Sequence, residues 1–356
     1  MSTMQSKHSM VKPSLLLLQP RLYSYRSSIF EALTSKYNIY GLFDLRCDPP
    51  SFTYSSLPEK KLIKWLTSFI KYVIVAKKNN NKIILFSPAY TTHLGIVISV
   101  FLSRLFGVKV VIHGQANFRK NSSNLSGKVI GLFWLAICNK YISYSHLGLS
   151  PPYKDSPKVT IIYNRYESLA SLGISSYPVI NDVVFSQSYP LKLLFIGRNR
   201  PNCGLELLTS ALLSLIKVCT VELHVISDSL HTDHKSIVFH GNVYGNKIIE
   251  ISKICHIGIY AGNAGLSILH YMCLGLCPIT HDSIFDHRGP EPDYIKSGYN
   301  GFTFKKDSAR DLVSLIEYLY SNPKVTYNAR KNAFISANDI HRKPYSADFD
   351  EIFQSL

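Results

Sequence analysis

Residues 255–281 read "CHIGIYAGNAGLSILHYMCLGLCPITH", and the order of residue types predicts a strand, a turn, a helix, a turn and a second strand. The runs 255–261 and 276–281 are short and apolar, as buried strands are. Between them a glycine-rich turn opens a segment with apolar residues at helical spacing, namely Leu266, Leu269 and Met272. Two strands joined by a helix form the repeating unit of a parallel α/β sheet.

The same alternation of apolar runs and helical segments continues in both directions along the chain. In the first half, strands are predicted at 14–20, 37–44, 82–88, 108–114, 140–146 and 158–165. In the second half they are predicted at 191–198, 221–228, 236–242, 255–261, 276–281 and 301–305. Most are continuous hydrophobic runs, which is typical of strands covered on both faces. The predicted fold class is therefore α/β, with two Rossmann-like doubly wound domains facing a cleft.

The domain boundaries follow from the same pattern. We expect an N-terminal domain at 1–180, a second domain at 181–335 and a helical tail at 336–356 that returns to the N-terminal domain. Residues 165–190 are loop-like and form the expected linker. Ligands bind at the carboxyl ends of the strands in such sheets, so we expect the active site between the halves.

Charge is distributed unevenly over the 356 residues. Residues 1–180 carry 22 Lys and Arg against 6 Asp and Glu, whereas residues 181–356 carry 17 of each sign, so the net charge of +16 belongs to the first half. An anionic partner is therefore expected at the N-terminal half.

The cysteines and the apolar runs indicate which cellular compartment to expect. The 7 cysteines form no C-x-x-C pair, which argues against a disulfide scaffold or a zinc site and fits a reducing cytoplasm. The apolar stretches near 94–106 and 129–138 are interrupted or too short to cross a bilayer, and the N-terminus lacks a signal sequence. We expect a soluble or peripheral protein.

Five motifs follow one another in the second half. They are FIGRNRP at 195–201, LHVI at 223–226, VFHG at 238–241, GLSILHYM at 265–272 and GYNG at 298–301. Their order and spacing resemble the donor half of the retaining B-fold (GT-B) glycosyltransferases, the group 1 family that builds bacterial surface polysaccharides. The first half is similar more loosely, through residues 19–26, 30–33 and 110–114. The resemblance implies an acceptor-binding first domain and a second domain that binds a nucleotide-diphosphate-sugar.

The resemblance implies that basic residues after the first strand of the donor domain hold the diphosphate. Gly197 and Arg198 match this position. Cys203 stands where the family has a lysine, and Arg200 is the nearest substitute. The alternative is that Arg198 and Arg200 are solvated loop charges.

The turn in the opening stretch supplies a second anchor for the donor. It comprises Asn263, Ala264 and Gly265, followed by Leu266 and Ser267 at the start of a helix. Backbone N–H groups and the helix dipole favour an anion there. A side chain at Gly265 is expected to block the approach of backbone to phosphate.

The turn also departs from the family pattern, which has two glutamates eight positions apart. Gly262 and His270 occupy those places. His270 could bond a ribose hydroxyl through a ring nitrogen, or it could be a buried structural histidine. Glu291 is the candidate replacement carboxylate for a ribose or donor-sugar contact, and the alternative is a plain turn-end carboxylate.

No metal cofactor is expected. The chain has no D-x-D pair before a sugar site, and Asp228, Asp233, Asp282 and Asp286 show no metal-binding spacing. Basic residues and helix N-termini would then stabilise the leaving group. By family analogy His113, after a strand of the first domain, contacts the donor sugar or the acceptor. The expected catalytic residues are thus His113, Arg198 and Glu291.

Two segments of the first half are expected to meet the acceptor or the membrane. The first carries Arg21, Tyr25 and Arg26. The second, residues 60–82, has seven lysines and no acid, and at about 100° per residue it forms a basic amphipathic helix. One row of that helix holds Lys60, Lys64, Lys71 and Lys78. Its apolar face is expected on the sheet, with the lysines solvated or against anionic lipid.

The sequence therefore predicts a cytoplasmic, peripheral, metal-independent retaining hexosyltransferase at the inner face of the plasma membrane. Its partners would be a nucleotide sugar and a lipid-linked anionic saccharide of O-antigen or capsule synthesis. Three alternatives stay open: a nucleotide-sugar epimerase of the same fold, a non-catalytic membrane scaffold, and a nucleic-acid binder. No recognisable nucleic-acid motif supports the last.

Overall fold

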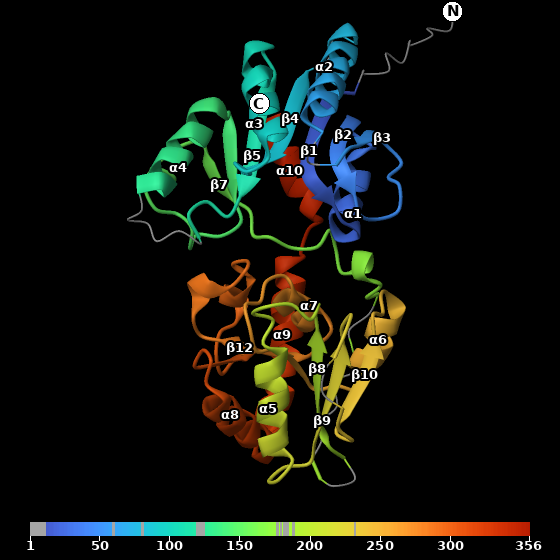
Figure 1. The fold of residues 1–356 in the computed structure, drawn as a ribbon, viewed down its shortest axis with the longest axis vertical. Helices are drawn as coiled ribbons and strands as arrows, with labels where there is room; N and C mark the ends of the chain where they lie inside the picture. The colour runs from blue at the N-terminus through green and yellow to red at the C-terminus, as the bar shows by residue number, and fades with distance from the viewer. Residues whose placement is uncertain are drawn as a thin grey trace, which may run out of the picture. The chain divides into compact units, whose positions relative to one another are not determined.

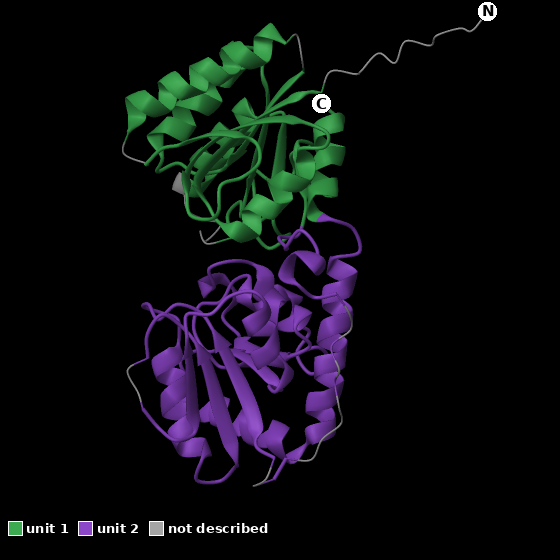
Figure 2. Cartoon of the chain, turned by 90° about the vertical axis from the view of Figure 1, so that its right-hand side faces the viewer, with its two compact units in different colours: residues 1–162, 345–356 green, residues 163–344 purple. Residues whose placement is uncertain are grey.

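The computed structural model describes residues 12–58, 61–79, 82–118, 125–175, 178, 180, 185–186, 189–230 and 233–356. They form two compact units, Met1–Ile162 with Tyr345–Leu356, and Tyr163–Pro344 (Figure 2). Each unit is built on one sheet of parallel strands with helices packed against it (Figure 1). The predicted α/β class with two doubly wound domains is confirmed.

The first unit contains a seven-stranded sheet in the order β3-β2-β1-β4-β5-β6-β7. Its strands are β1 (Ser14–Leu22), β2 (Asn38–Leu45), β3 (Thr53–Ser56), β4 (Ile83–Pro88), β5 (Lys109–Gly114), β6 (Lys140–Ser143) and β7 (Val159–Ile161). The sequence does not predict β3, because the polar segment TYSS lacks an apolar run. As the edge strand, β3 needs no apolar residues on both faces.

Helices cover both faces of this sheet. They are α1 (Ser24–Leu33), α2 (Leu62–Lys78), α3 (Leu94–Leu105), α4 (Leu125–Ile137) and α10 (Tyr345–Gln354). Trp65 and Phe69 of α2 and Trp134 of α4 lie in one core. Phe30 of α1 and Phe349 of α10 lie in the core on the other face. The predicted amphipathic helix is therefore present as α2, with its aromatic side chains on the sheet.

The C-terminal helix α10 belongs to the first unit. Asp350 accepts a hydrogen bond from Lys36 Nζ at 2.6 Å and another from Tyr37 Oη at 2.7 Å. The return begins at Tyr345, whereas the sequence places the tail at 336–356, because residues 336–340 still belong to α9 (Pro323–Ile340) of the second unit.

The change from the first unit to the second lies after Ile162 rather than at 180. Tyr166 is buried in the core of the second unit, and Leu169, Leu172 and Ile174 pack against that core. Part of the expected linker thus packs on the core of the second unit, because Tyr166 is buried there and the other three side chains are partly buried against it.

The second unit contains a six-stranded sheet in the order β10-β9-β8-β11-β12-β13. The strands are β8 (Leu191–Ile196), β9 (Val221–Ile226), β10 (Ile237–Gly241), β11 (Ile257–Tyr260), β12 (Cys277–His281) and β13 (Phe302–Phe304). Each falls within a predicted strand. All pairings are parallel, so the carboxyl ends of these strands share one edge.

The helices of the second unit are α5 (Leu205–Leu215), α6 (Asn246–Lys253), α7 (Ser267–Cys273), α8 (Ala309–Ser321) and α9. Short 3₁₀ turns lie at η1 (Ala170–Leu172), η2 (Ile284–Asp286) and η3 (Glu291–Tyr294). The opening stretch folds as predicted, into β11, α7 and β12. A Cβ at Gly258 would lie 2.2 Å from the Tyr271 ring, so glycine lets α7 pack closely on β11.

Each sheet reverses its strand order at one point, between β1 and β4 in the first unit and between β8 and β11 in the second. The loops that leave adjacent strands there diverge, which opens a crevice at the carboxyl edge. Each unit therefore has one expected ligand position of its own.

Candidate functional site

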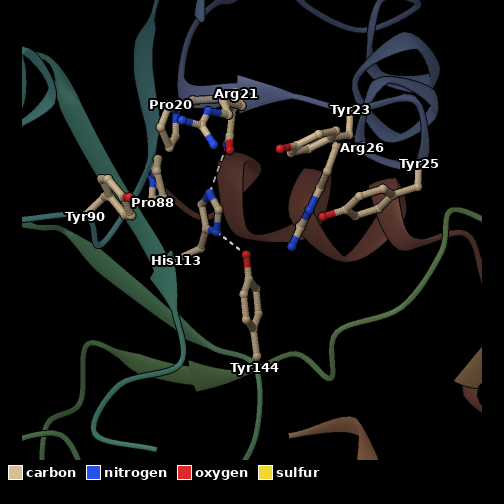
Figure 3. A pocket seen from close by; sticks show the side chains of 10 residues that line it. Pro20, Arg21, Tyr23, Tyr25, Arg26, Pro88, Tyr90, His113 and Tyr144 are labelled. Atoms are coloured by element: carbon tan, nitrogen blue, oxygen red, sulfur yellow. Dashed lines mark hydrogen bonds between the residues drawn. The ribbon is translucent and has the colours of Figure 1, made fainter. Parts of the chain in front are cut away.

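A cavity of about 300 Å³ lies at the carboxyl edge of the first sheet, at its switch point (Figure 3). Four residues expected at a site, His113, Arg21, Tyr25 and Arg26, all line it. The remaining lining residues are Gln19, Pro20, Tyr23, Pro88, Tyr90 and Tyr144. The fold thus brings the ends of β1, β4, β5 and β6 to one cavity.

An irregularity in β1 shapes this cavity. The pairing of β1 with β2 shifts between Leu18 and Arg21, at Gln19 and Pro20. Proline cannot donate to the ladder, and such bulges re-aim side chains next to ligand sites. The bulge turns Gln19 toward His113, whose Nε2 lies 3.1 Å from Gln19 Nε2.

His113 is buried and hydrogen-bonded at both ring nitrogens. Because an amide nitrogen only donates, His113 Nε2 accepts from Gln19 and Nδ1 donates to Tyr144 Oη (Figure 3). Its ring also stacks on Phe86, with centroids 4.4 Å apart. Burial, together with the positive charge of Arg26, holds the pKa of His113 well below its usual value. His113 is therefore neutral near pH 7 and suits a contact role better than that of a proton-accepting base.

Arg26 places a positively charged guanidinium in the same cavity. Its guanidinium lies 5.3 Å from the centroid of the Tyr144 ring and 5.6 Å from that of Tyr25. Burial lowers the pKa of Arg26, but Tyr144 and Tyr25 outweigh it, so the net direction is upward. A fixed cation between aromatic faces suits an anionic or sugar-bearing ligand.

In the second unit, the loop after β8 carries Gly197, Arg198 and Arg200. Asn199 N–H donates to Asp228 Oδ1, which follows β9, at 2.7 Å. This hydrogen bond is the main cause of the lowered pKa of Asp228. Arg198 and Arg200 are both exposed, so they remain accessible to a ligand.

The backbones of the loop after β8 and the turn after β11 are in close contact. A Cβ at Gly262 would lie 2.3 Å from the Asn202 carbonyl oxygen, and one at Gly204 would lie 2.1 Å from Gly262 N. Gly204 also has φ of +78°. The position where the family carries its first glutamate therefore has no room for any side chain. Close backbone packing, rather than a ligand, accounts for Gly262.

The turn itself offers fewer backbone donors than the sequence indicates. Asn263 N–H donates to Asn202 O at 2.8 Å, and Ala264 N–H donates to His287 Nδ1 at 3.0 Å. Ala264 is buried. Among the described residues, the N–H groups of Gly265, Leu266 and Ser267 have no backbone or side-chain acceptor. The expected phosphate contact of the turn thus narrows to these three groups.

A histidine pair that the sequence does not single out supports the turn. The rings of His281 and His287 stack with centroids 3.9 Å apart. His287 Nε2 donates to the His281 carbonyl at 3.0 Å, and His281 Nε2 lies 3.2 Å from Asn263 Oδ1. Burial and the neighbouring His281 lower the pKa of His287 to about 4, so its Nδ1 stays an acceptor at neutral pH.

Glu291, the candidate replacement carboxylate, lies beside Gly265. Its Oε2 is 3.7 Å from the position of a Cβ on Gly265 and 2.1 Å from that of a Cβ on Gly289. The side chain is 2% exposed, and Oε1 accepts a hydrogen bond from Asn164 Nδ2. Asn164 is 127 positions away in sequence, which is why sequence reasoning misses it.

His270, on α7, is partly buried against an aromatic side chain. Its ring packs against Tyr166, with centroids 5.7 Å apart, and burial lowers its pKa to about 4. Tyr166 in turn stacks on His341 of the same unit. The described contacts of His270 are those of a packed histidine, and its ribose role stays a prediction.

Arg288 is a further cation that sequence reasoning misses. Its Nη2 donates to the Pro201 carbonyl at 3.2 Å, next to Arg200. Its backbone N–H donates to Ala264 O at 2.7 Å. Arg288 therefore joins the loop after β8 to the turn after β11, close to Cys203, where the family lysine is missing.

On α2, Lys64, Lys71 and Lys78 are exposed, whereas Lys60 lies outside the described residues. Within the described ranges, no helix has the length and hydropathy to cross a bilayer. Within the same ranges, no group of three His, Cys, Asp or Glu side chains could hold a metal ion.

Comparisons with known proteins concern the second unit and the fold. Residues 182–335 match the family model "Glycosyl transferases group 1". No curated protein matches the chain.

Solved structures resemble the chain over almost its whole length. A glycosyltransferase from Rickettsia africae ESF-5 is 15% identical, with a TM-score of 0.71, over 97% of this chain and 98% of that one. Anabaena Alr3699/HepE, in complex with UDP and glucose, is 13% identical, with a TM-score of 0.67, over 97% and 100%. The lipopolysaccharide outer core galactosyltransferase WaaB is 14% identical, with a TM-score of 0.64, over 96% and 100%.

The chain thus has the GT-B fold of these solved structures, and most of its second unit matches the group 1 glycosyltransferase model. The group 1 match and the neighbours together support a GT-B glycosyltransferase.

Proposed function

We propose that this protein is a retaining hexosyltransferase that takes a sugar from a nucleotide-diphosphate-sugar and transfers it to a lipid-linked, anionic saccharide. The acceptor would be an undecaprenyl-diphosphate intermediate of O-antigen or capsule synthesis, met at the inner face of the plasma membrane. Neighbours that hold UDP, and one that acts on lipopolysaccharide outer core, support the donor and acceptor classes. The basic first half of the chain suits a diphosphate-bearing acceptor.

One arrangement carries the donor part of the proposal. At the switch point of the second sheet, inside the group 1 domain, Arg288 links the loop that carries Arg198 to the turn before Gly265. Glu291 lies against the same turn. Cations, backbone N–H groups and one carboxylate at this edge can hold a diphosphate and a sugar hydroxyl.

The proposed reaction forms one bond and breaks one. The acceptor hydroxyl oxygen bonds to the anomeric carbon while the bond from that carbon to the diphosphate oxygen breaks on the same face. The acceptor proton passes to the departing phosphate oxygen. Arg198, Arg200 and Arg288 stabilise the charge that develops on that phosphate, with Arg288 in place of the missing lysine. No metal takes part in this proposal.

The test begins with a thermal-shift screen of UDP, GDP, dTDP and their sugars, since a ligand at 100 times its Kd adds about 2.7 kcal/mol of stability. Arg198→Gln and Arg288→Gln should each weaken binding of the selected nucleotide about tenfold or more, because a charged hydrogen bond is lost. Arg342→Gln is the matched control, since Arg342 is an exposed arginine paired with Asp339. No shift with any nucleotide would remove the donor proposal.

Product analysis separates the alternatives. A transferase gives a glycosylated acceptor with retained configuration, whereas an epimerase converts the nucleotide sugar without an acceptor. A non-catalytic scaffold gives neither product nor hydrolysis. Activity that EDTA abolishes and magnesium or manganese restores would contradict metal independence.

A further inference from the structure

Three neighbouring helices of the first unit expose large apolar side chains to solvent. On α2, α3 and α4 respectively, Ile63 is 78% exposed, Leu105 69% and Leu132 58%. The other exposed apolar side chains on these helices are Ile70, Ile74, Leu94, Phe101, Val129 and Phe133. Because α2 packs beside α3, and α3 beside α4, they form one surface, which we call the α2–α4 face (Figure 1).

Basic side chains are interleaved with these apolar ones. Lys64, Lys71 and Lys78 of α2, Arg104 of α3 and Lys128 of α4 are all exposed. Lys77 Nζ lies 5.5 Å from the centroid of the Phe106 ring, so the ends of α2 and α3 meet through one cation–aromatic contact. The chain contains no Asp or Glu between Glu59 and Asp155. The α2–α4 face is therefore both apolar and uniformly positive.

The apolar side chains of α2 are not the ones that pack on the sheet. Trp65, Phe69 and Val73 are buried, whereas Ile63, Ile70 and Ile74 are exposed. At about 100° per residue the three isoleucines form a strip beside the row of Lys64, Lys71 and Lys78. The helix thus has a buried aromatic face and a second, exposed apolar strip next to its lysines. The expectation that the apolar face lies on the sheet, with the lysines solvated or against anionic lipid, does not account for this strip.

We propose that the α2–α4 face docks on the interface of a bilayer that contains anionic lipid. Its apolar side chains enter the boundary between headgroups and acyl chains, and its lysines and arginine contact the phosphates. This combination of an apolar strip and a basic row is how amphipathic helices bind in the plane of an interface. The inference rests on the proposed function for its setting, because a lipid-linked acceptor lies at such an interface.

Charge decides against a second copy of the chain as the occupant. A twofold contact places the same patch on both subunits, so lysines would face lysines with no carboxylate from this face to pair them. A nucleic acid would satisfy the cations but leave large aliphatic side chains in water. An anionic bilayer satisfies both sets of groups.

Vesicle co-sedimentation of the full chain tests the proposal. The probes are vesicles of pure phosphatidylcholine and vesicles with about one-third phosphatidylglycerol. The triple variant K64Q/K71Q/K78Q should lower binding to the anionic vesicles on the order of a hundredfold. The variant I63S/L105S/L132S, with one exposed side chain from each helix, should lower it at least about tenfold. Added salt should weaken wild-type binding more than it weakens binding of the lysine variant.

The second unit supplies a matched control. Val218, Tyr244 and Ile254 are exposed to a similar extent, so V218S/Y244S/I254S removes comparable apolar area elsewhere. This variant should bind vesicles as wild type does. All three variants change exposed positions and should keep the wild-type melting temperature.

Insertion is measured separately by fluorescence. The two native tryptophans, Trp65 and Trp134, are buried, so a Leu105→Trp variant adds one reporter on the α2–α4 face. Brominated lipid should quench its emission on vesicles, and a Tyr244→Trp variant should stay unquenched. Quenching at 105 but not at 244 identifies this face as the inserted one.

Two results with the variant I63S/L105S/L132S would overturn the inference. One is wild-type vesicle binding by I63S/L105S/L132S. The other is a dimer in light scattering that the same variant converts to a monomer, which would make the α2–α4 face a contact between copies. If the protein turns over nucleotide sugar but does not bind vesicles, only the docking of the α2–α4 face is contradicted. If it binds vesicles through this face but binds no nucleotide, the proposed transfer reaction is contradicted instead.

Discussion

The ring of His287 holds the backbone of Ala264. His287 Nδ1 accepts the Ala264 N–H at 3.0 Å, and its Nε2 donates to the carbonyl of His281 at 3.0 Å. Both ring nitrogens are thus used, which fixes a neutral tautomer in a buried site. Since the turn before Gly265 leads into the proposed phosphate contacts, the position of those contacts depends on His287.

Replacing His287 should therefore loosen the turn before it affects the rest of the unit. His287→Ala leaves a buried N–H without an acceptor, which costs about 1–3 kcal/mol. Hydrogen exchange of residues 262–268 should rise in this variant, and nucleotide affinity should fall about tenfold. His287→Asn, which can place an oxygen near Nδ1, should restore part of both.

The control for His287 is another histidine pair in the same unit. His224 Nδ1 and His240 Nε2 form a hydrogen bond of 2.9 Å, and the two rings stack with centroids 5.2 Å apart. His224→Ala should lower stability without changing exchange at 262–268. Equal effects of the two alanine variants on the turn would mean that His287 acts only through general stability.

Substitution of the two glycines of the turn should affect different properties, stability at Gly262 and nucleotide binding at Gly265. A Cβ on Gly262 meets the Asn202 oxygen at 2.3 Å, so Gly262→Ala should lower the free energy of unfolding by about 1–3 kcal/mol. A Cβ on Gly265 has no neighbour closer than 3.7 Å, so Gly265→Ala should change stability little. If a phosphate lies against this backbone, Gly265→Ala should nevertheless weaken nucleotide binding, as titration calorimetry would show. Unchanged affinity in Gly265→Ala would place the phosphate elsewhere.

Most of the fold follows from the sequence because its signals are local. Twelve strands are predicted from apolar runs, and each is present, since strands covered on both faces must be apolar throughout. The edge strand β3 is missed because Thr53–Ser56 is polar. The unit boundary is misplaced because Tyr166 lies in a loop-like sequence yet is buried in the second core.

The candidate sites are less accessible to sequence reasoning, because their contacts join distant segments. Sequence reasoning selects Glu291 as a candidate carboxylate at a turn, but its position beside Gly265 emerges only from the structure. Its partner Asn164, the support from His287 and the bridge by Arg288 arise only when the loops after different strands meet. The absence of a carboxylate at Gly262 is visible in the sequence, but its cause, contact with Asn202, is not.

Acid should destabilise the protein before its carboxylates titrate. Burial lowers the pKa of His256 to about 3 and that of His287 and His341 to about 4. The unfolded chain, with histidine pKa near 6.5, binds more protons below that pH, so stability is complete above about pH 6.5 and falls toward about pH 4. Each such histidine adds a slope of about 1.4 kcal/mol per pH unit in that window.

Urea denaturation between about pH 7 and pH 5 measures this slope, since ordinary carboxylates titrate mostly below that range. His256→Asn removes one titrating ring. It should reduce the slope of the free energy of unfolding against pH by about 1.4 kcal/mol per pH unit, which corresponds to one proton. A free energy of unfolding that stays constant from about pH 7 to pH 5 would contradict the buried neutral state of these rings.

The attachment of α10 should depend on Asp350. Its carboxylate accepts from Lys36 and Tyr37, and these bonds hold the pKa of Asp350 below its usual value despite burial, which alone would raise it. Asp350→Asn should cost about 1–3 kcal/mol and raise hydrogen exchange in Tyr345–Gln354. A double-mutant cycle with Tyr37→Phe should show coupling. Additive effects in that cycle would mean that the two side chains stabilise α10 independently.

Arg26 should matter for the acceptor rather than for the donor. It is the cation placed between the Tyr25 and Tyr144 rings in the cavity of the first unit, while the proposed diphosphate contacts lie in the second. Arg26→Gln should raise the KM for a lipid-linked diphosphate acceptor about tenfold or more, because a charge-assisted contact is lost, and leave the nucleotide Kd unchanged. Arg46→Gln is the control, since Arg46 is an exposed arginine paired with Asp44 outside the cavity. Steady-state kinetics with varied acceptor and calorimetry with nucleotide give the two readouts. Loss of nucleotide affinity in Arg26→Gln, with the acceptor KM unchanged, would assign this cavity to the donor instead.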